Sequence, residues 1–204
     1  CKVFSLAGDV IRQTSQNKLS NATRYVNVMA DDIVKIDGMI PWKDAVDEWL
    51  SCAGDVIDGI GIDHYPGTWS VLKPFNYNNW SPLSTLLTRV NNNSDGNLWY
   101  GKIPAVLETG FSSWSSVVAS EKDQARWCNE SLQAMFDVAY DSEHVKNETY
   151  RTLSLVNFYQ LIDEDKGGGG GLTPPEELQF GVVRSDGSKK KAFDVLAKVL
   201  HRLV

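Results

Sequence analysis

Apolar residues in this chain fall into short continuous runs that alternate with longer stretches of helical spacing. Four runs read as strands, at about 24–30, 56–63, 102–108 and 153–159. Amphipathic spacing predicts helices at about 3–16, 42–52, 82–91, 121–140 and 192–203. The strand runs do not alternate strictly between apolar and polar residues, which is typical of strands covered on both faces by helices. The pattern therefore predicts an α/β fold of parallel strands joined by right-handed crossovers.

One of these runs ends abruptly in a carboxylate. Apolar residues from Ile103 to Leu107 lead directly to Glu108, and Thr109 and Gly110 follow. An α/β barrel places its catalytic groups at the carboxyl ends of such strands. A strand-end glutamate in a surface salt bridge would give the same local pattern. Glu108 is therefore a candidate catalytic acid whose meaning depends on the rest of the chain.

Composition limits the possible partners. The chain has 204 residues, a formal net charge of -6 and 42% hydrophobic residues, which fits one ordinary globular domain. The negative net charge argues against nucleic acid or an anionic membrane as a partner. The single basic run, at 189–191, fits a solvated helix start. No run approaches the roughly 18 apolar residues of a membrane span. No metal-ligand spacing and no nucleotide-binding glycine loop occur, so we expect neither a metal nor a cofactor.

The sequence also indicates a compartment. Five N-glycosylation acceptor patterns occur, at Asn21, Asn79, Asn92, Asn129 and Asn147. They favour a secreted or lumenal protein. An oxidising compartment permits one disulfide among Cys1, Cys52 and Cys128, with three pairings open, and leaves an odd thiol for a partner. Three buried reduced cysteines are the alternative.

Four segments resemble one family of enzymes. They are DGIGIDHYP at 58–66, IPAVLETG at 103–110, NFYQLIDE at 157–164 and FGVVRSDGS at 180–188. In order and spacing they resemble strands six, seven and eight of the retaining glycoside hydrolases of clan GH-A, which have a (β/α)8 barrel. The motif at 58–66 is most similar to the galactanase branch. The resemblance covers nearly the whole chain.

The resemblance implies roles for individual residues. Glu108 matches the nucleophile at the end of strand seven, and Tyr65 matches an aromatic residue whose hydroxyl bonds and orients that nucleophile. Tyr159 stands where the clan usually has the tryptophan that floors the sugar site. Further sugar contacts are expected from rim residues with aromatic or polar side chains, namely His64, Trp69, Trp80, Trp114 and Tyr159. Ordinary packing is the alternative for each of them.

The same resemblance leaves one catalytic group unaccounted for. Retaining glycosidases need a second carboxyl group about 5 to 5.5 Å from the nucleophile. In the clan it follows an asparagine at the end of strand four, whereas this chain begins in what resembles the next helix. Other acids are expected near the rim, at 31–32 and 163–165, but none of them matches the position of the acid/base. The acids at 163–165 are explained by solvation or by capping of the glycine-rich loop that follows them.

We therefore expect residues 1–204 to form a single domain, the carboxyl-terminal half of a glycosidase-like TIM barrel with strands five to eight. The expected function is that of a secreted retaining β-glycosidase acting on a carbohydrate substrate, with the acid/base supplied by a missing upstream segment. Because a half-barrel exposes two strand edges, an upstream half-barrel chain or self-association is expected to complete it. One alternative is an inactive glycan-binding or structural extracellular protein on the same scaffold. Another is an unrelated open α/β sheet.

Overall fold

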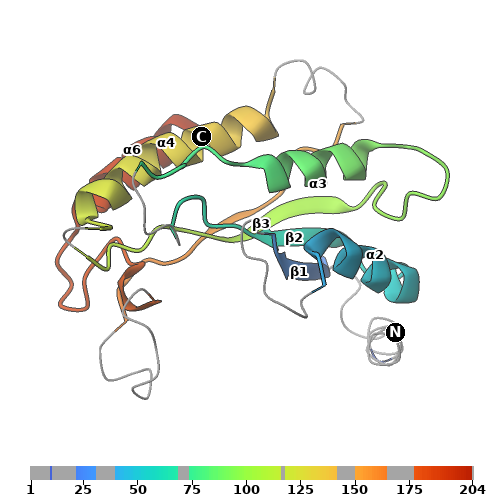
Figure 1. The fold of residues 1–204 in the computed structure, drawn as a ribbon, viewed down its shortest axis with the longest axis horizontal. Helices are drawn as coiled ribbons and strands as arrows, with labels where there is room; N and C mark the ends of the chain where they lie inside the picture. Colours follow the sequence, from blue (N-terminus) through green and yellow to red (C-terminus); the bar gives the residue numbers. More distant parts are fainter. Residues whose placement is uncertain are drawn as a thin grey trace. The chain divides into compact units, whose positions relative to one another are not determined.

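The computed structural model describes residues 10, 22–30, 40–68, 74–115, 118–141, 150–164 and 177–203. Strands and helices alternate along these residues (Figure 1). In chain order they are β1 (Tyr25–Met29), α2 (Trp42–Ala53), β2 (Gly59–Asp63), α3 (Ser81–Asn91), β3 (Ile103–Thr109), α4 (Glu121–Ala139), β4 (Val156–Phe158), the short 3-10 helix η1 (Glu177–Gln179) and α6 (Lys191–Leu203). The predicted helix at 3–16 lies almost wholly outside the described residues.

The strands form one sheet of four in the order β1-β2-β3-β4. β1 and β2 pair in parallel, with Tyr25 opposite Gly59 and Met29 opposite Asp63. Strands that are consecutive in the chain are thus neighbours in the sheet, as successive βα units require. The predicted α/β fold with parallel strands is confirmed.

Strand boundaries differ from the sequence prediction for a local reason. β2 begins at Gly59 and not at residue 56, because Val56 still closes the turn after α2 by donating its N–H to the Ala53 carbonyl at 3.0 Å. β4 is reduced to Val156–Phe158. Its flanks nevertheless bond β3, since Val106 donates to the Leu155 carbonyl at 2.9 Å.

Helix starts follow their capping residues. Ser120 caps α4 in a capping box, where its side chain accepts from the Asp123 N–H and the Asp123 side chain accepts from the Ser120 N–H. Pro41 is the N-cap residue of α2. None of the described helices is long and apolar enough to cross a membrane.

The chain divides into two compact units. The first comprises Cys1–Asp63, Pro82–Leu107 and Ser142–Val156, and the second comprises His64–Ser81, Glu108–Asp141 and Asn157–Val204. The divisions fall at the end of β2, within β3 and within β4. The first unit therefore holds all of β1 and β2 and most of β3, while the second holds the end of β3 and most of β4. The expected single domain stays a prediction.

The first unit has an apolar core and several polar contacts between its segments. Its buried side chains come from both helices and strands and include Val46, Leu50, Ile60, Ile62, Leu83, Leu86, Val90, Ala105 and Val106. Arg24 precedes β1, and its guanidinium donates to both carboxylate oxygens of Asp58, at 2.7 and 3.0 Å. The ammonium of Lys102 donates to the Gly54 and Ile57 carbonyls at 2.6 and 2.7 Å. These contacts hold together segments that lead into the strands.

The second unit is built on two helices that lie side by side, α4 and α6 (Figure 1). The faces that they bury include Trp127, Leu132, Met135, Ala192, Leu196 and Val199. The indole N–H of Trp127 donates to the Pro66 carbonyl at 3.0 Å. The fully buried Gln124 amide donates to the carbonyls of Phe111 and Phe180 at 2.8 and 3.1 Å. Helix α4 thereby anchors loops that follow the strand ends.

Candidate active site

Glu108 meets a tyrosine from the neighbouring strand. Tyr65 lies two residues beyond β2, and its hydroxyl donates to Glu108 Oε2 at 2.6 Å. The N–H of His64 donates to the backbone carbonyl of Glu108 at 2.9 Å, which fixes the relation between the two strand ends. The Tyr65 ring is buried, whereas Glu108 is partly exposed. The structure thus contains the hydrogen bond that the resemblance implied, while the catalytic roles stay predictions.

An aromatic row continues from Tyr65. The Phe180 ring packs edge-on against Tyr65 and against Tyr159, with centroid distances of 5.4 and 5.3 Å. The Tyr159 hydroxyl donates to Glu164 Oε1 at 3.2 Å. We call the five residues Glu108, Tyr65, Phe180, Tyr159 and Glu164 the rim row. It carries one carboxylate at each end and three aromatic rings between them.

Backbone contacts set the position of Tyr159. Its N–H donates to the Thr109 carbonyl at 2.7 Å, so the ends of β3 and β4 remain paired. Phe158, the preceding residue, packs against Trp127 of α4 at a centroid distance of 6.0 Å. Tyr159 itself lies one residue beyond β4 and is partly exposed. Sequence resemblance placed Tyr159 at the sugar site, and that role stays a prediction.

Gly110 permits the close approach of these two strand ends. A Cβ atom at this position would collide with the Tyr159 backbone carbonyl. The Gly110 carbonyl also accepts from the Thr68 hydroxyl at 2.8 Å. A larger residue would therefore push apart the ends of the strands that carry Glu108 and Tyr159.

Two of the expected sugar-contact residues are packed inside the second unit. His64 is 4% exposed, and its Nε2 lies 2.6 Å from the Asn79 carbonyl oxygen. Its ring packs edge-on against Trp80, which is itself buried and donates from Nε1 to the Ser131 carbonyl at 2.9 Å. Trp80 is therefore a packing residue. A sugar contact for His64 stays a prediction.

The other aromatic candidates have different outcomes. Trp114 is half-buried and follows the end of β3, so part of its ring is accessible. Trp69 lies outside the described residues. Of the expected glycosylation positions, Asn92 and Asn129 are exposed and Asn79 is half-buried, whereas Asn21 and Asn147 lie outside the described part of the chain.

Asp163, one of the acids after β4, is part of a buried cluster. The ammonium of Lys190 donates to Asp163 Oδ1 at 2.7 Å, to Ser113 Oγ at 2.9 Å and to the Gln179 carbonyl at 3.2 Å. Burial raises the pKa of Asp163 and lowers that of Lys190, although each ion partly offsets this effect for the other. Asp163 thus holds loops together.

The same cluster corrects the sequence interpretation of the basic run 189–191. We expected a solvated helix start, yet Lys190 is only 3% exposed. The burial of Lys190 could not be predicted from its local sequence, because its partners Ser113 and Asp163 are distant along the chain. The acids at 31–32 and Asp165 lie outside the described residues.

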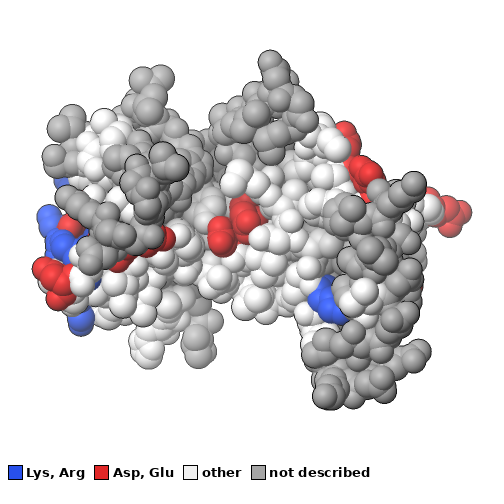
Figure 2. Space-filling view, turned by 90° about the horizontal axis from the view of Figure 1, so that it is seen from below, with Lys and Arg blue, Asp and Glu red and all other residues white. Residues whose placement is uncertain are grey.

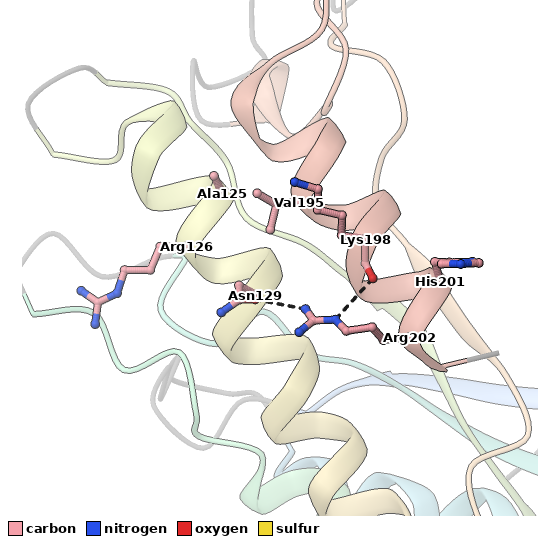
Figure 3. A pocket seen from close by; sticks show the side chains of 7 residues that line it. All are labelled: Ala125, Arg126, Asn129, Val195, Lys198, His201 and Arg202. Atoms are coloured by element: carbon pink, nitrogen blue, oxygen red, sulfur yellow. Dashed lines mark hydrogen bonds between the residues drawn. The ribbon is translucent and has the colours of Figure 1, made fainter.

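The structure also contains a groove of about 670 Å³ between α4 and α6. It is lined by Ala125, Arg126, Asn129, Val195, Lys198, His201 and Arg202 (Figure 3). Arg202 spans it, donating to Asn129 Oδ1 at 3.3 Å and to the Lys198 carbonyl at 3.4 Å, while Arg126 points away. The groove includes no residue of the rim row.

On the face shown in Figure 2, acidic side chains occur as small separate groups; one lies among uncharged residues and another lies beside basic side chains. Among the described residues, no group of three or more histidine, cysteine, aspartate or glutamate side chains could hold a metal ion.

Comparison with known proteins identifies the fold. No protein-family model and no curated protein sequence matches the chain. Solved structures do match the chain. A family 2 β-galacturonidase from Eisenbergiella tayi matches 97% of this chain and 37% of its own, with a TM-score of 0.52 and 18% identity. Xylanase B from Clostridium stercorarium F9 matches 93% of this chain and 50% of its own, with a TM-score of 0.55 and 17% identity.

A family 17 β-1,3-glucanosyltransferase from Rhizomucor miehei matches 92% of this chain and 56% of its own, at a TM-score of 0.51 and 15% identity. The chain has the fold of part of a glycoside hydrolase barrel. It spans between about a third and just over half of the length of these three enzymes. At such identities the likeness concerns the scaffold, and it gives no sugar specificity.

Proposed function

We propose that this chain is the carboxyl-terminal half of a retaining β-glycosidase, with Glu108 as the nucleophile. The observation that carries the proposal is the 2.6 Å hydrogen bond from Tyr65 to Glu108 Oε2, made where two neighbouring strands end on a glycoside hydrolase scaffold. A barrel of this kind has its catalytic groups at those strand ends. Partial exposure leaves Glu108 accessible to a substrate.

The proposed chemistry has two steps. Glu108 attacks the anomeric carbon while a second carboxylic acid protonates the leaving oxygen, so one glycosidic bond breaks and a glycosyl ester forms. The second group then removes a proton from water, which attacks the same carbon and releases Glu108. Tyr65 holds the attacking carboxylate in one orientation by donating to Oε2, so that Oε1 is directed to the sugar.

The second carboxyl group is proposed to come from outside this chain. Among the acids after β4 that the structure describes, Asp163 is paired with Lys190 and Glu164 accepts from Tyr159. Exposed side chains on the edge strands support the proposal that a partner completes the barrel. Met29 in β1 and Leu155 beside β4 are 54% and 45% exposed, whereas β2, between neighbours on both sides, is almost wholly buried. An upstream half-barrel segment or a second copy would cover such edges.

Substitution of the proposed nucleophile tests the function. In the native protein that contains this chain, Glu108→Gln should lower the hydrolysis of aryl β-glycosides by about 1,000-fold or more, because the glycosyl ester can no longer form. Tyr65→Phe keeps the ring and loses the hydrogen bond, so a smaller loss of about 10-fold to 100-fold is expected. Glu130→Gln, at a partly exposed position of α4, is the matched control and should retain full activity.

Chemical rescue makes the assignment specific. With Glu108→Gly and an activated aryl β-glycoside, azide should restore turnover and give the α-glycosyl azide, since azide occupies the space of the missing carboxylate. A wild-type protein that binds sugars but hydrolyses none of them would instead support the rival function, a glycan-binding protein that kept the scaffold.

We also propose passage through the secretory pathway. Cys128 is a buried free thiol whose pKa is raised by burial to about 12, so a disulfide within the chain would join Cys1 to Cys52. Mass spectrometry of the native protein, before and after reduction and deglycosylation, should show this bond, glycans on exposed acceptors such as Asn92, and any disulfide-linked upstream polypeptide. A mass equal to that of the unmodified, fully reduced chain would contradict this proposal.

A further inference from the structure

The rim row has an unbalanced charge. Its two ends are carboxylates, Glu108 and the exposed Glu164. Two of the described cations beside the neighbouring segments are paired with other acids. Lys190 is bonded to Asp163 at 2.7 Å, and Arg184 is bonded to Glu121 at 2.5 Å. The described part of the site therefore presents negative charge to a ligand.

Glu164 is also positioned to bind a neutral sugar. A carboxylate accepts several hydrogen bonds, and the Tyr159 hydroxyl supplies one of them, to Oε1. No other described side chain bonds this carboxylate, so its remaining acceptor positions can receive the hydroxyl groups of a substrate. The partly exposed Tyr159 ring beside it offers an aromatic surface for the apolar face of a pyranose. Ring and carboxylate together form a subsite for an uncharged, hydroxyl-rich ring.

We propose that this site selects uncharged sugars and rejects uronic acids, and that Glu164 is the residue that determines this selectivity. This inference rests on the proposed glycosidase function. The carboxylate of a uronic acid bound against the Tyr159 ring would lie near Glu164, and like charges brought together repel each other. The β-galacturonidase with a similar fold is named for the opposite preference.

The test compares matched pairs of substrates. For the native protein, kcat/KM for p-nitrophenyl β-glucoside or β-galactoside should exceed that for the corresponding β-glucuronide or β-galacturonide by at least about tenfold. Glu164→Gln retains an acceptor and removes the charge, so it should reduce this ratio about tenfold by raising uronide turnover. High salt should reduce the ratio in the wild type more than in Glu164→Gln, because ions screen an exposed charge.

Two variants separate charge from structure. Glu130→Gln removes an equal charge from α4, away from the rim row, and should leave the ratio unchanged. Tyr159→Phe keeps the ring and the charge of Glu164, so it should weaken binding of both sugars and preserve the ratio. A wild type that prefers uronides, or a ratio that Glu164→Gln does not change, would overturn the inference.

Binding experiments keep this inference distinct from the proposed function. If the protein turns over no glycoside, the glycosidase proposal fails. Saturation-transfer NMR with methyl β-glucoside and methyl β-glucuronide then still tests the selectivity. Preferential binding of the glucoside, reduced by Glu164→Gln, supports it. Equal binding of the two sugars, or binding of neither, overturns it.

Discussion

Two ion pairs, one in each compact unit, show how differently the two units use charge. In the first unit Arg24 and Asp58 form a two-pronged pair whose side chains are 30% and 32% exposed. In the second unit Lys190 and Asp163 form a pair whose side chains are 1% and 11% exposed. Both pairs join segments that are distant in sequence. Only the second lies among the loops that follow the strand ends, near the rim row.

Exposure decides whether such a pair stabilises the protein. The hydrogen bonds from Arg24 lower the pKa of Asp58 below its ordinary value of 3.8, so this pair favours folding when Asp58 is ionised. For Lys190 and Asp163 burial is the largest influence, and it shifts both pKa values toward the neutral forms. The first unit thus gains a small stability from its pair, whereas the second unit contains a pair that is costly mainly when broken.

The largest expected effect is the loss of the buried cation. Lys190→Met should lower the free energy of unfolding by about 3 to 5 kcal/mol, because Asp163 would remain buried without its partner. Urea unfolding followed by tryptophan fluorescence measures the change. The matched control is Lys191→Met, since Lys191 is exposed at the start of α6, and it should change stability by less than about 0.5 kcal/mol.

A double variant sharpens this result. Lys190→Met combined with Asp163→Leu removes both charges and should regain most of the lost stability, since no uncompensated ion remains. If Lys190→Met were no more destabilising than Lys191→Met, the contrast between the two units would not hold.

A smaller effect is expected in the first unit. Asp58→Asn should cost about 1 kcal/mol at neutral pH, because both side chains are partly solvated. The folded-state pKa of Asp58 is lowered, so its contribution is complete above pH 3.8 and is lost as pH falls through the folded-state value. Wild-type and variant stabilities should therefore converge once the pH falls below the folded-state pKa of Asp58.

Acid unfolding curves measure this convergence. Asp95→Asn, in an exposed loop, serves as the control and should track the wild type at every pH. A gap between wild type and Asp58→Asn that persists unchanged into strong acid would show that Asp58 acts by packing and not by charge.

Much of this fold could be predicted from apolar periodicity. The described helices begin and end within a few residues of the predicted ranges, because each buries a stripe at helical spacing, as Val46 and Leu50 do in α2. Strand limits were less predictable. Val56 is as apolar as the strand it precedes, but a turn hydrogen bond keeps it out of the ladder.

Within the candidate site, the strand-end motif identified Glu108 and the family resemblance identified Tyr65. Phe180, Gly110 and Lys190 could not be assigned their contacts from sequence. Each contact joins segments dozens of residues apart, such as Phe180 with Tyr65 or Lys190 with Ser113. Trp80 shows the converse error, since an aromatic residue in an apparent loop proved to be buried against α4.

The sequence by itself determined the order of strands and helices and the position of one carboxylate at a strand end, because both are encoded in local spacing. Only the tertiary structure decided which groups meet that carboxylate and which charges are neutralised. Pairing of parallel strands brings their carboxyl ends together, so Tyr65 and Glu108, far apart in the chain, share a hydrogen bond. Burial then set the roles of the remaining acids. Asp163 was enclosed with Lys190, while Glu164 stayed exposed beside Tyr159.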